Sequence, residues 1–112
     1  MPIAICYTKD KKLDEKKIDS FVSQWAENIG VHISDVSLTI LPNSIQFGQQ
    51  YDVLCNLHLP SLWSSENVEN IQNQLLVLLC KAYESNSDKI LIITNIVQSG
   101  NVVENGKSVN WK

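Results

Sequence analysis

The sequence contains no arginine, because all nine of its basic side chains are lysines. A guanidinium group can hold a carboxylate or phosphate with two parallel hydrogen bonds, whereas an ammonium group acts as a point charge. Forked recognition of an acidic ligand is therefore excluded. The formal net charge of −3 also argues against a nucleic-acid partner, which needs a basic surface.

Cysteine is scarce and lacks the spacing of a metal or redox site. Cys6, Cys55 and Cys80 form no C-x-x-C pair, and His32 and His58 are too few and too scattered to complete a zinc site. Such cysteines are typical of small buried apolar positions in strands and helices. We therefore expect no metal, no cofactor and a reducing, cytoplasmic setting.

Long apolar runs are also missing. No segment approaches the roughly 20 apolar residues of a membrane span, and the short N-terminal apolar run followed by lysines does not fit a signal peptide. We expect no membrane partner. A hydrophobic fraction of 44% with 19% charged residues is typical of a globular chain. The length of 112 residues predicts a single domain over residues 1–112.

The hydrophobic pattern predicts two similar halves, about 1–50 and 51–112, each with the order strand, helix, strand. Predicted strands cover residues 2–8, 35–41, 51–59 and 89–97, and predicted helices cover residues 14–29 and 64–84. Asn105-Gly106 predicts a short hairpin in the tail. Right-handed crossovers would make each half a β-α-β unit with a parallel strand pair. The predicted α/β (α+β) fold is a four-stranded mixed sheet with both helices on one face, plus a C-terminal hairpin.

The central strands are apolar on both faces, whereas two helices can cover only one face. Neighbouring copies of the chain are the economical cover for the other face, and the tail hairpin is an arm that could reach them. We therefore expect a homo-oligomer.

Pro2 is the most informative single residue. Removal of the initiator Met1 would expose a secondary amine, and an α-amino group titrates at about 7.7–8.0 and lower when buried. The strand over residues 2–8 would hold this amine at a sheet end, where a pocket can form. Two alternatives remain open. Pro2 can simply be tolerated at the start of an edge strand, and a retained Met1 would make its nitrogen a non-basic amide.

A series of short motifs extends along nearly the whole chain. They are Pro2-Ile3-Ala4, the basic turn ending at Lys12, Asp14-Glu15-x-Lys17, Leu41-Pro42-Asn43, Phe47-Gly48, Leu54-Cys55-Asn56-Leu57-His58, Asp88-Lys89-Ile90 and Asn101-Val102…Asn105-Gly106-Lys107-Ser108. Their order and spacing resemble the tautomerase superfamily. The N-terminal half is similar to 4-oxalocrotonate tautomerase, and the length and C-terminal half are similar to macrophage migration inhibitory factor.

The resemblance implies a homotrimer whose sheets line an inner barrel, and a cofactor-free tautomerase or isomerase that acts on a small enolisable 2-oxo acid. Carried onto this chain, Pro2 is the general acid/base. Lys12 stands where the tautomerase branch has a carboxylate-binding arginine, with Lys9 and Lys11 as alternatives in the same turn. Phe47 matches an aromatic residue that makes the pocket apolar. Ser37 occupies the position of a second arginine and is a candidate substrate contact.

Several positions depart from the family pattern. Val31, Leu91 and Ile93 replace polar site residues of the migration-inhibitory branch, and its redox C-x-x-C has lost one cysteine. No oxyanion donor is identified, although one such donor commonly contributes about 2.7–4 kcal/mol. Three functions remain open. The one we expect is a tautomerase with a degenerate site. The others are a signalling protein that is secreted without a signal peptide, and a trimeric binding or scaffold protein without turnover.

Overall fold

Two β-α-β units follow one another along the chain in the computed structural model, which describes residues 1–9 and 14–111. The first unit consists of β1 (Ile3–Thr8), α1 (Glu15–Ile29) and β2 (Ser37–Leu41). The second consists of β3 (Val53–Pro60), α2 (Ser65–Tyr83) and β4 (Ile90–Val97). Short 3₁₀ turns precede β2 and β4, at Ile33–Asp35 and Ser87–Lys89. The hairpin strands β5 (Val102–Glu104) and β6 (Lys107–Val109) follow β4.

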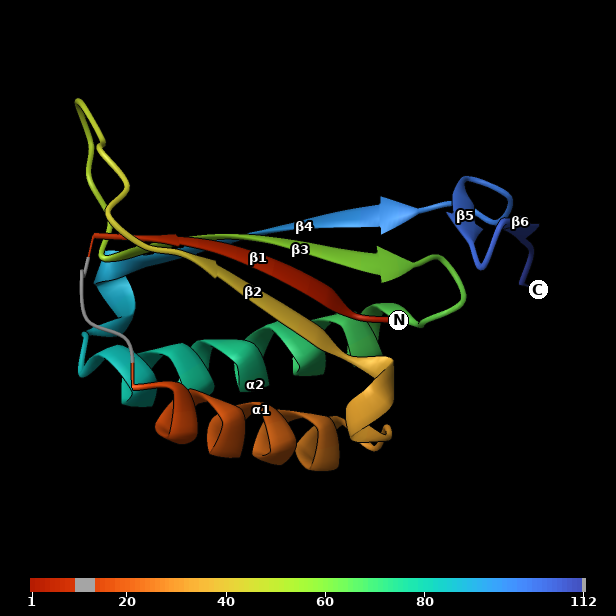
Figure 1. The fold of residues 1–112 in the computed structure, drawn as a ribbon, viewed down its shortest axis with the longest axis horizontal. Helices are drawn as coiled ribbons and strands as arrows, with labels where there is room; N and C mark the ends of the chain where they lie inside the picture. Colours follow the sequence, from red (N-terminus) through yellow and green to blue (C-terminus); the bar gives the residue numbers. More distant parts are fainter. Residues whose placement is uncertain (10–13, 112) are drawn as a thin grey trace.

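The four long strands form one mixed sheet in the order β2-β1-β3-β4. Pairing is parallel within each unit, and the two units meet through the antiparallel pair β1–β3. Both helices lie on the same face of this sheet (Figure 1). The fold predicted from the sequence pattern is therefore confirmed.

The helix ends are set by local capping residues. The carboxylate of Asp14 accepts a hydrogen bond from the Lys17 backbone N–H at 3.1 Å, and α1 stops at Gly30, whose φ of 78° is left-handed. The Ser64 hydroxyl caps α2 in the same way, through the Asn67 backbone N–H at 3.2 Å. A side chain that accepts a hydrogen bond directly before a helix, and a glycine directly after it, are common at helix ends.

The core fills the space between the sheet and the helices. Trp25 of α1 is buried against α2, where its indole N–H donates to the carbonyl of Ile71 at 3.3 Å. The other fully buried core side chains come from β1, β3 and α2, and include Ala4, Cys6, Val53, Cys55, Leu57, Leu59, Leu75 and Leu79. This side-chain pattern alternates along β1 and β3, as expected for strands with only one covered face.

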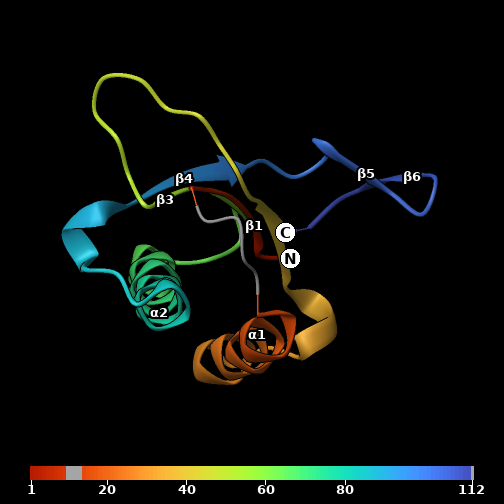
Figure 2. The ribbon, with the colours of Figure 1, turned by 60° about the vertical axis from the view of Figure 1, so that its left-hand side comes forward.

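The opposite face of the sheet carries the alternate residues, among them Ile3, Ile5, Leu54 and Ile93. Residues 1–9 and 14–111 include no helix or strand that covers this face (Figure 2). Ile93 is 46% exposed. Asn56 and His58 of β3 lie on the same face, so it combines apolar and polar side chains. Exposed apolar side chains gathered on one face are typical of a surface that contacts another molecule.

The second strand begins later than the sequence pattern predicts. Asp35 lies in the 3₁₀ turn rather than in a strand, and β2 starts at Ser37. The turn is held by the His32 ring, which accepts from the Ser34 backbone N–H at 3.1 Å, and by the His32 carbonyl, which accepts from the Asp35 backbone N–H at 2.9 Å. These local hydrogen bonds compete with the extended conformation that the alternating pattern favours.

Candidate functional site

Pro2 precedes β1 directly and is fully buried. Its carbonyl accepts a hydrogen bond from the Ser37 backbone N–H at 3.0 Å, which fixes it beside the first residue of β2. Proline has no N–H to offer a neighbouring strand, so the start of a strand is a position it occupies without losing a ladder hydrogen bond.

A cavity of about 350 Å³ surrounds this end of β1. Its walls come from the N-terminus, from the 3₁₀ turn with the start of β2, and from β5. The lining residues are Met1, Pro2, Ile3, Ser34, Asp35, Val36, Ser37 and Glu104. Figure 1 shows the N-terminus and the β5–β6 hairpin at the same end of the sheet. The cavity therefore forms where segments about 100 residues apart in sequence meet.

The hairpin that supplies Glu104 is tied to the body of the protein through Trp111. The Trp111 backbone N–H donates to the Ser99 hydroxyl at 2.8 Å, and its indole N–H donates to the Ser61 hydroxyl at 3.0 Å. Ser61 directly follows β3, so the tail is anchored to the second β-α-β unit. These bonds hold β5 beside the N-terminus within one chain.

The burial and the charges of the cavity change the pKa of the N-terminal amine. Burial lowers the pKa of the Met1 α-amino group from its usual value, and the nearby carboxylates of Asp35 and Glu104 oppose this shift. Burial disfavours the charged form of an amine, and neighbouring anions favour it. An amine held in this cavity is therefore a weaker base than one in water, and its charge state depends on the two carboxylates.

The residues predicted from the sequence are placed as follows. Pro2 and Ser37 line the same cavity. Phe47 lies in the loop between β2 and β3 and is 87% exposed, and Figure 1 shows this loop at the opposite end of the sheet from the N-terminus. Lys12 lies outside the described residues. One chain thus brings together two of the four candidates.

Comparison with known proteins rests on structure. No family model matches this sequence, and no curated protein matches it significantly. Among solved structures, a fused 4-OT asymmetric trimer has a TM-score of 0.77 at 15% identity, with 95% of this chain and 94% of that chain covered. The fold is that of the tautomerase superfamily.

Two further solved structures are similar to this chain in fold. A macrophage migration inhibitory factor homologue from Prochlorococcus marinus has a TM-score of 0.74 at 12% identity, with 96% of this chain and 99% of that chain covered. The protein Pt0534, inactivated by 2-oxo-3-pentynoate, has a TM-score of 0.75 at 11% identity, with 96% and 94% covered. Both branches that the sequence motifs resemble are thus represented among the structural neighbours.

Asp35 and Glu104 were not among the candidates predicted from the sequence. The sequence pattern predicts Asp35 at the start of a strand, and Glu104 follows the predicted hairpin strand over residues 101–103. Asp35 stands in none of the motifs, and Glu104 falls in the gap between Asn101-Val102 and Asn105-Gly106. The parallel pairing of β1 and β2 places the 3₁₀ turn beside Pro2, and this register is the signal from which Asp35 could have been found.

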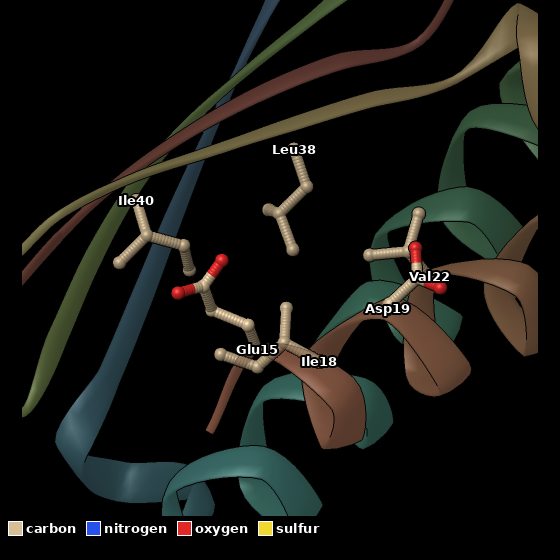
Figure 3. Close-up of a pocket in the computed structure, with 6 residues that line it drawn as sticks. All are labelled: Glu15, Ile18, Asp19, Val22, Leu38 and Ile40. Carbon is tan, nitrogen blue, oxygen red and sulfur yellow. The ribbon is translucent and has the colours of Figure 1, made fainter. Parts of the chain in front are cut away.

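A second cavity of about 310 Å³ lies between α1 and the edge strand β2. Leu38 and Ile40 of β2 point toward the helix, as Figure 3 shows, and Ile18 and Val22 contribute from α1. Glu15 and Asp19 add carboxylates on the helix side. This cavity lies on the helix-covered face and contains neither Pro2 nor Ser37, so it is separate from the candidate site.

Two of the three cysteines, Cys6 and Cys55, are buried as the sequence predicts, whereas Cys80 on α2 is half-buried. Cys6 and Cys55 face each other across β1 and β3, and both are fully buried. A hydrogen bond with the Cys55 thiol, together with burial, raises the pKa of the Cys6 thiol. Within residues 1–9 and 14–111, no cluster of side chains could hold a metal ion, and no helix is long and apolar enough to cross a membrane.

Proposed function

We propose that this chain, once Met1 is removed, is a cofactor-free tautomerase that moves a proton on a small enolisable 2-oxo compound through the nitrogen of Pro2. The observation that carries the proposal is the position of Pro2, which is buried in the wall of a cavity that Met1 also lines. Loss of Met1 would leave the Pro2 nitrogen facing this cavity as a free amine.

The chemistry needs one group that both accepts and donates a proton. A neutral Pro2 amine would take the hydroxyl proton of the enol, and the resulting ammonium would deliver a proton to the adjacent carbon. General acid/base catalysis works best when the pKa of the group lies near the working pH. Burial lowers the pKa of the Met1 amine at this position, and the carboxylates of Asp35 and Glu104 oppose that shift. We expect a free Pro2 amine to be subject to the same two opposing influences.

The 2-oxo class is supported by the resemblance and by the neighbour with the tautomerase fold that is inactivated by 2-oxo-3-pentynoate. Ser37 can contact a substrate at Pro2 within one chain, because both residues line the cavity. Lys12 stays a predicted carboxylate contact, and Phe47 stays a predicted apolar wall. Phe47 would reach a Pro2 cavity only in another copy of the chain.

Assembly as a homotrimer belongs to the same proposal. Within residues 1–9 and 14–111, no helix or strand covers the sheet face opposite the helices, which carries Ile93. Ile45 and Phe47 are 82% and 87% exposed in the β2–β3 loop. One neighbour with this fold is described as an asymmetric trimer. We expect native mass spectrometry to give three times the mass of one chain. A monomer at micromolar concentration would contradict this part of the proposal.

The catalytic part is tested by the ketonisation of phenylenolpyruvate, on protein whose intact mass shows that Met1 is absent. We expect a rate above the buffer rate that is lost in Pro2→Ala, while the circular dichroism spectrum stays unchanged. Equal rates for the unmodified protein and Pro2→Ala would contradict the tautomerase proposal. A folded trimer without turnover would favour the alternative, a binding or signalling protein of the migration-inhibitory type.

A further inference from the structure

The Pro2 cavity is lined by negative charge. Among the described residues that line it, the ionisable side chains are Asp35, from the 3₁₀ turn, and Glu104, from β5. The other lining side chains are apolar or hydroxylic, and no described lysine contributes to the wall. Two carboxylates from separate parts of the chain therefore converge on the place where a substrate would meet Pro2.

The fold positions the backbone segments that carry the two carboxylates. The turn that carries Asp35 is closed by hydrogen bonds to the His32 carbonyl and the His32 ring. Glu104 ends β5 opposite Lys107 of β6. Trp111, which follows this hairpin, is anchored to Ser61. The two segments that carry Asp35 and Glu104 thus both line the cavity at the N-terminus.

A substrate carboxylate in this cavity would approach two like charges, both carried by residues that are exposed in the single chain. Like-charge juxtaposition is a means by which proteins reject unwanted partners. An ester of the same substrate keeps the 2-oxo group and the enolisable carbon and removes the negative charge. The walls of this cavity therefore favour the uncharged form of a 2-oxo compound.

We propose that Asp35 and Glu104 are specificity-determining residues, which make the Pro2 cavity select an uncharged enolisable 2-oxo compound, such as an ester, over a 2-oxo acid anion. This inference rests on the proposed function and narrows its substrate class. It departs from the expectation drawn from the sequence resemblance, in which a 2-oxo acid is held by a cation.

After removal of Met1, the same two carboxylates would also act on the Pro2 amine, as they do on the Met1 amine. They stabilise its ammonium form, so their removal lowers the pKa of the amine. Among the residues that the structure describes, charged or titratable groups on the same elements are His32, in the turn of Asp35, and Lys107, opposite Glu104. In Asp35→Asn with Glu104→Gln, the acidic limb of the pH profile of kcat/KM should move to lower pH, because the neutral amine persists there.

The test compares phenylenolpyruvate with its methyl ester at pH 7.5. We expect kcat/KM for the ester to exceed that for the acid by about tenfold or more. A tenfold ratio corresponds to about 1.4 kcal/mol. The double variant Asp35→Asn/Glu104→Gln should bring this ratio toward one, mainly through better turnover of the acid.

The matched control is Asp19→Asn/Glu15→Gln, which removes two carboxylates from the separate cavity beside α1. It changes the net charge by the same amount and should leave the ester-to-acid ratio unchanged. Preference of the unmodified protein for the acid would overturn the inference. An unchanged ratio in the Asp35/Glu104 variant would overturn it as well.

A binding experiment separates this inference from the proposed function. Benzoylformate and methyl benzoylformate are 2-oxo compounds that cannot enolise, so both can be titrated without turnover. Their binding is read from the backbone amide signals of Ile3 and Ser37, which mark the cavity. Tighter binding of the ester, lost in the double variant, supports the charge selection even if no enol is turned over. Tighter binding of the acid contradicts it.

Discussion

At the scale of single residues, the protonation of the Cys6 thiol is coupled to folding. It is fully buried, faces Cys55 across the β1–β3 pair, and has a raised thiol pKa. In the unfolded chain the thiol would ionise near its ordinary pKa of about 8.5. The folded state keeps its proton at pH values where the unfolded state loses it.

The free energy of unfolding should therefore fall as the pH rises above about 8.5, because the unfolded state then binds fewer protons than the folded state. For one thiol the loss approaches about 1.4 kcal/mol per pH unit. Urea unfolding of the reduced protein between pH 8 and pH 10 measures this slope. Cys6→Ala should have a shallower slope, and equal slopes in the two proteins would contradict the assignment.

The three thiols should also differ in reactivity. Cys6 and Cys55 are fully buried, whereas Cys80 on α2 is half-buried. We expect a thiol reagent added to the folded protein to label Cys80 first, and all three cysteines only after denaturation. Peptide mapping of the labelled protein identifies the sites. Rapid labelling of Cys6 in the folded state would contradict the buried position.

At the scale of the elements, α1 depends on the capping residue directly before it. Asp14 caps the helix through the Lys17 N–H, and loss of such a cap costs about 0.5–2 kcal/mol. We expect Asp14→Ala to lower the free energy of unfolding by this amount in urea titrations. Asp14→Asn retains an acceptor oxygen and should lose only a few tenths of a kcal/mol. Equal losses in both variants would show that charge, rather than the cap, is what matters.

The β5–β6 hairpin carries Glu104, which lines the candidate site. Trp111→Phe removes the indole N–H that donates to Ser61 while keeping an aromatic ring. We expect amide hydrogen exchange to increase in residues 102–109 and to stay unchanged in β1 and β3. Ser61→Ala should give the same local pattern. Faster exchange throughout the sheet would mean that Trp111 supports the core instead of the hairpin.

The elements also show what the sequence could predict. Capping by Asp14 and Gly30 is local, so both ends of α1 were predicted to within one residue. The hairpin turn at Asn105 and Gly106 was predicted for the same reason, and both residues have positive φ. The start of β2 was missed because hydrogen bonds around His32 replace two residues of strand with a turn.

The candidate site was predicted only in part, because its walls come from distant segments. Pro2 and Ser37 could be named from the motifs, and the structure places both in one cavity. Glu104 approaches Pro2 only after the tail folds back onto the sheet, about 100 residues further along the chain. No local pattern encodes that contact, so the negative charge of the cavity could not be read from the sequence.

At the scale of the whole molecule, the uncovered sheet face should control assembly. Ile93 on this face and Val77 on α2 are each 46% exposed. A lysine in a buried interface carries a large desolvation cost, whereas a lysine on a free surface does not. We expect Ile93→Lys to sediment as a monomer and Val77→Lys to keep the assembly of the unmodified chain. Identical sedimentation of both variants would place the interface elsewhere.

The central claim is that the free amine of Pro2 carries out the proton transfer. The most direct measurement compares the rate of phenylenolpyruvate ketonisation by two proteins. One begins with free Pro2 at its N-terminus, and the other retains one residue before Pro2. We predict turnover by the first protein and a loss of at least about a hundredfold in the second, since its Pro2 nitrogen is an amide. Equal rates in the two proteins would contradict the claim.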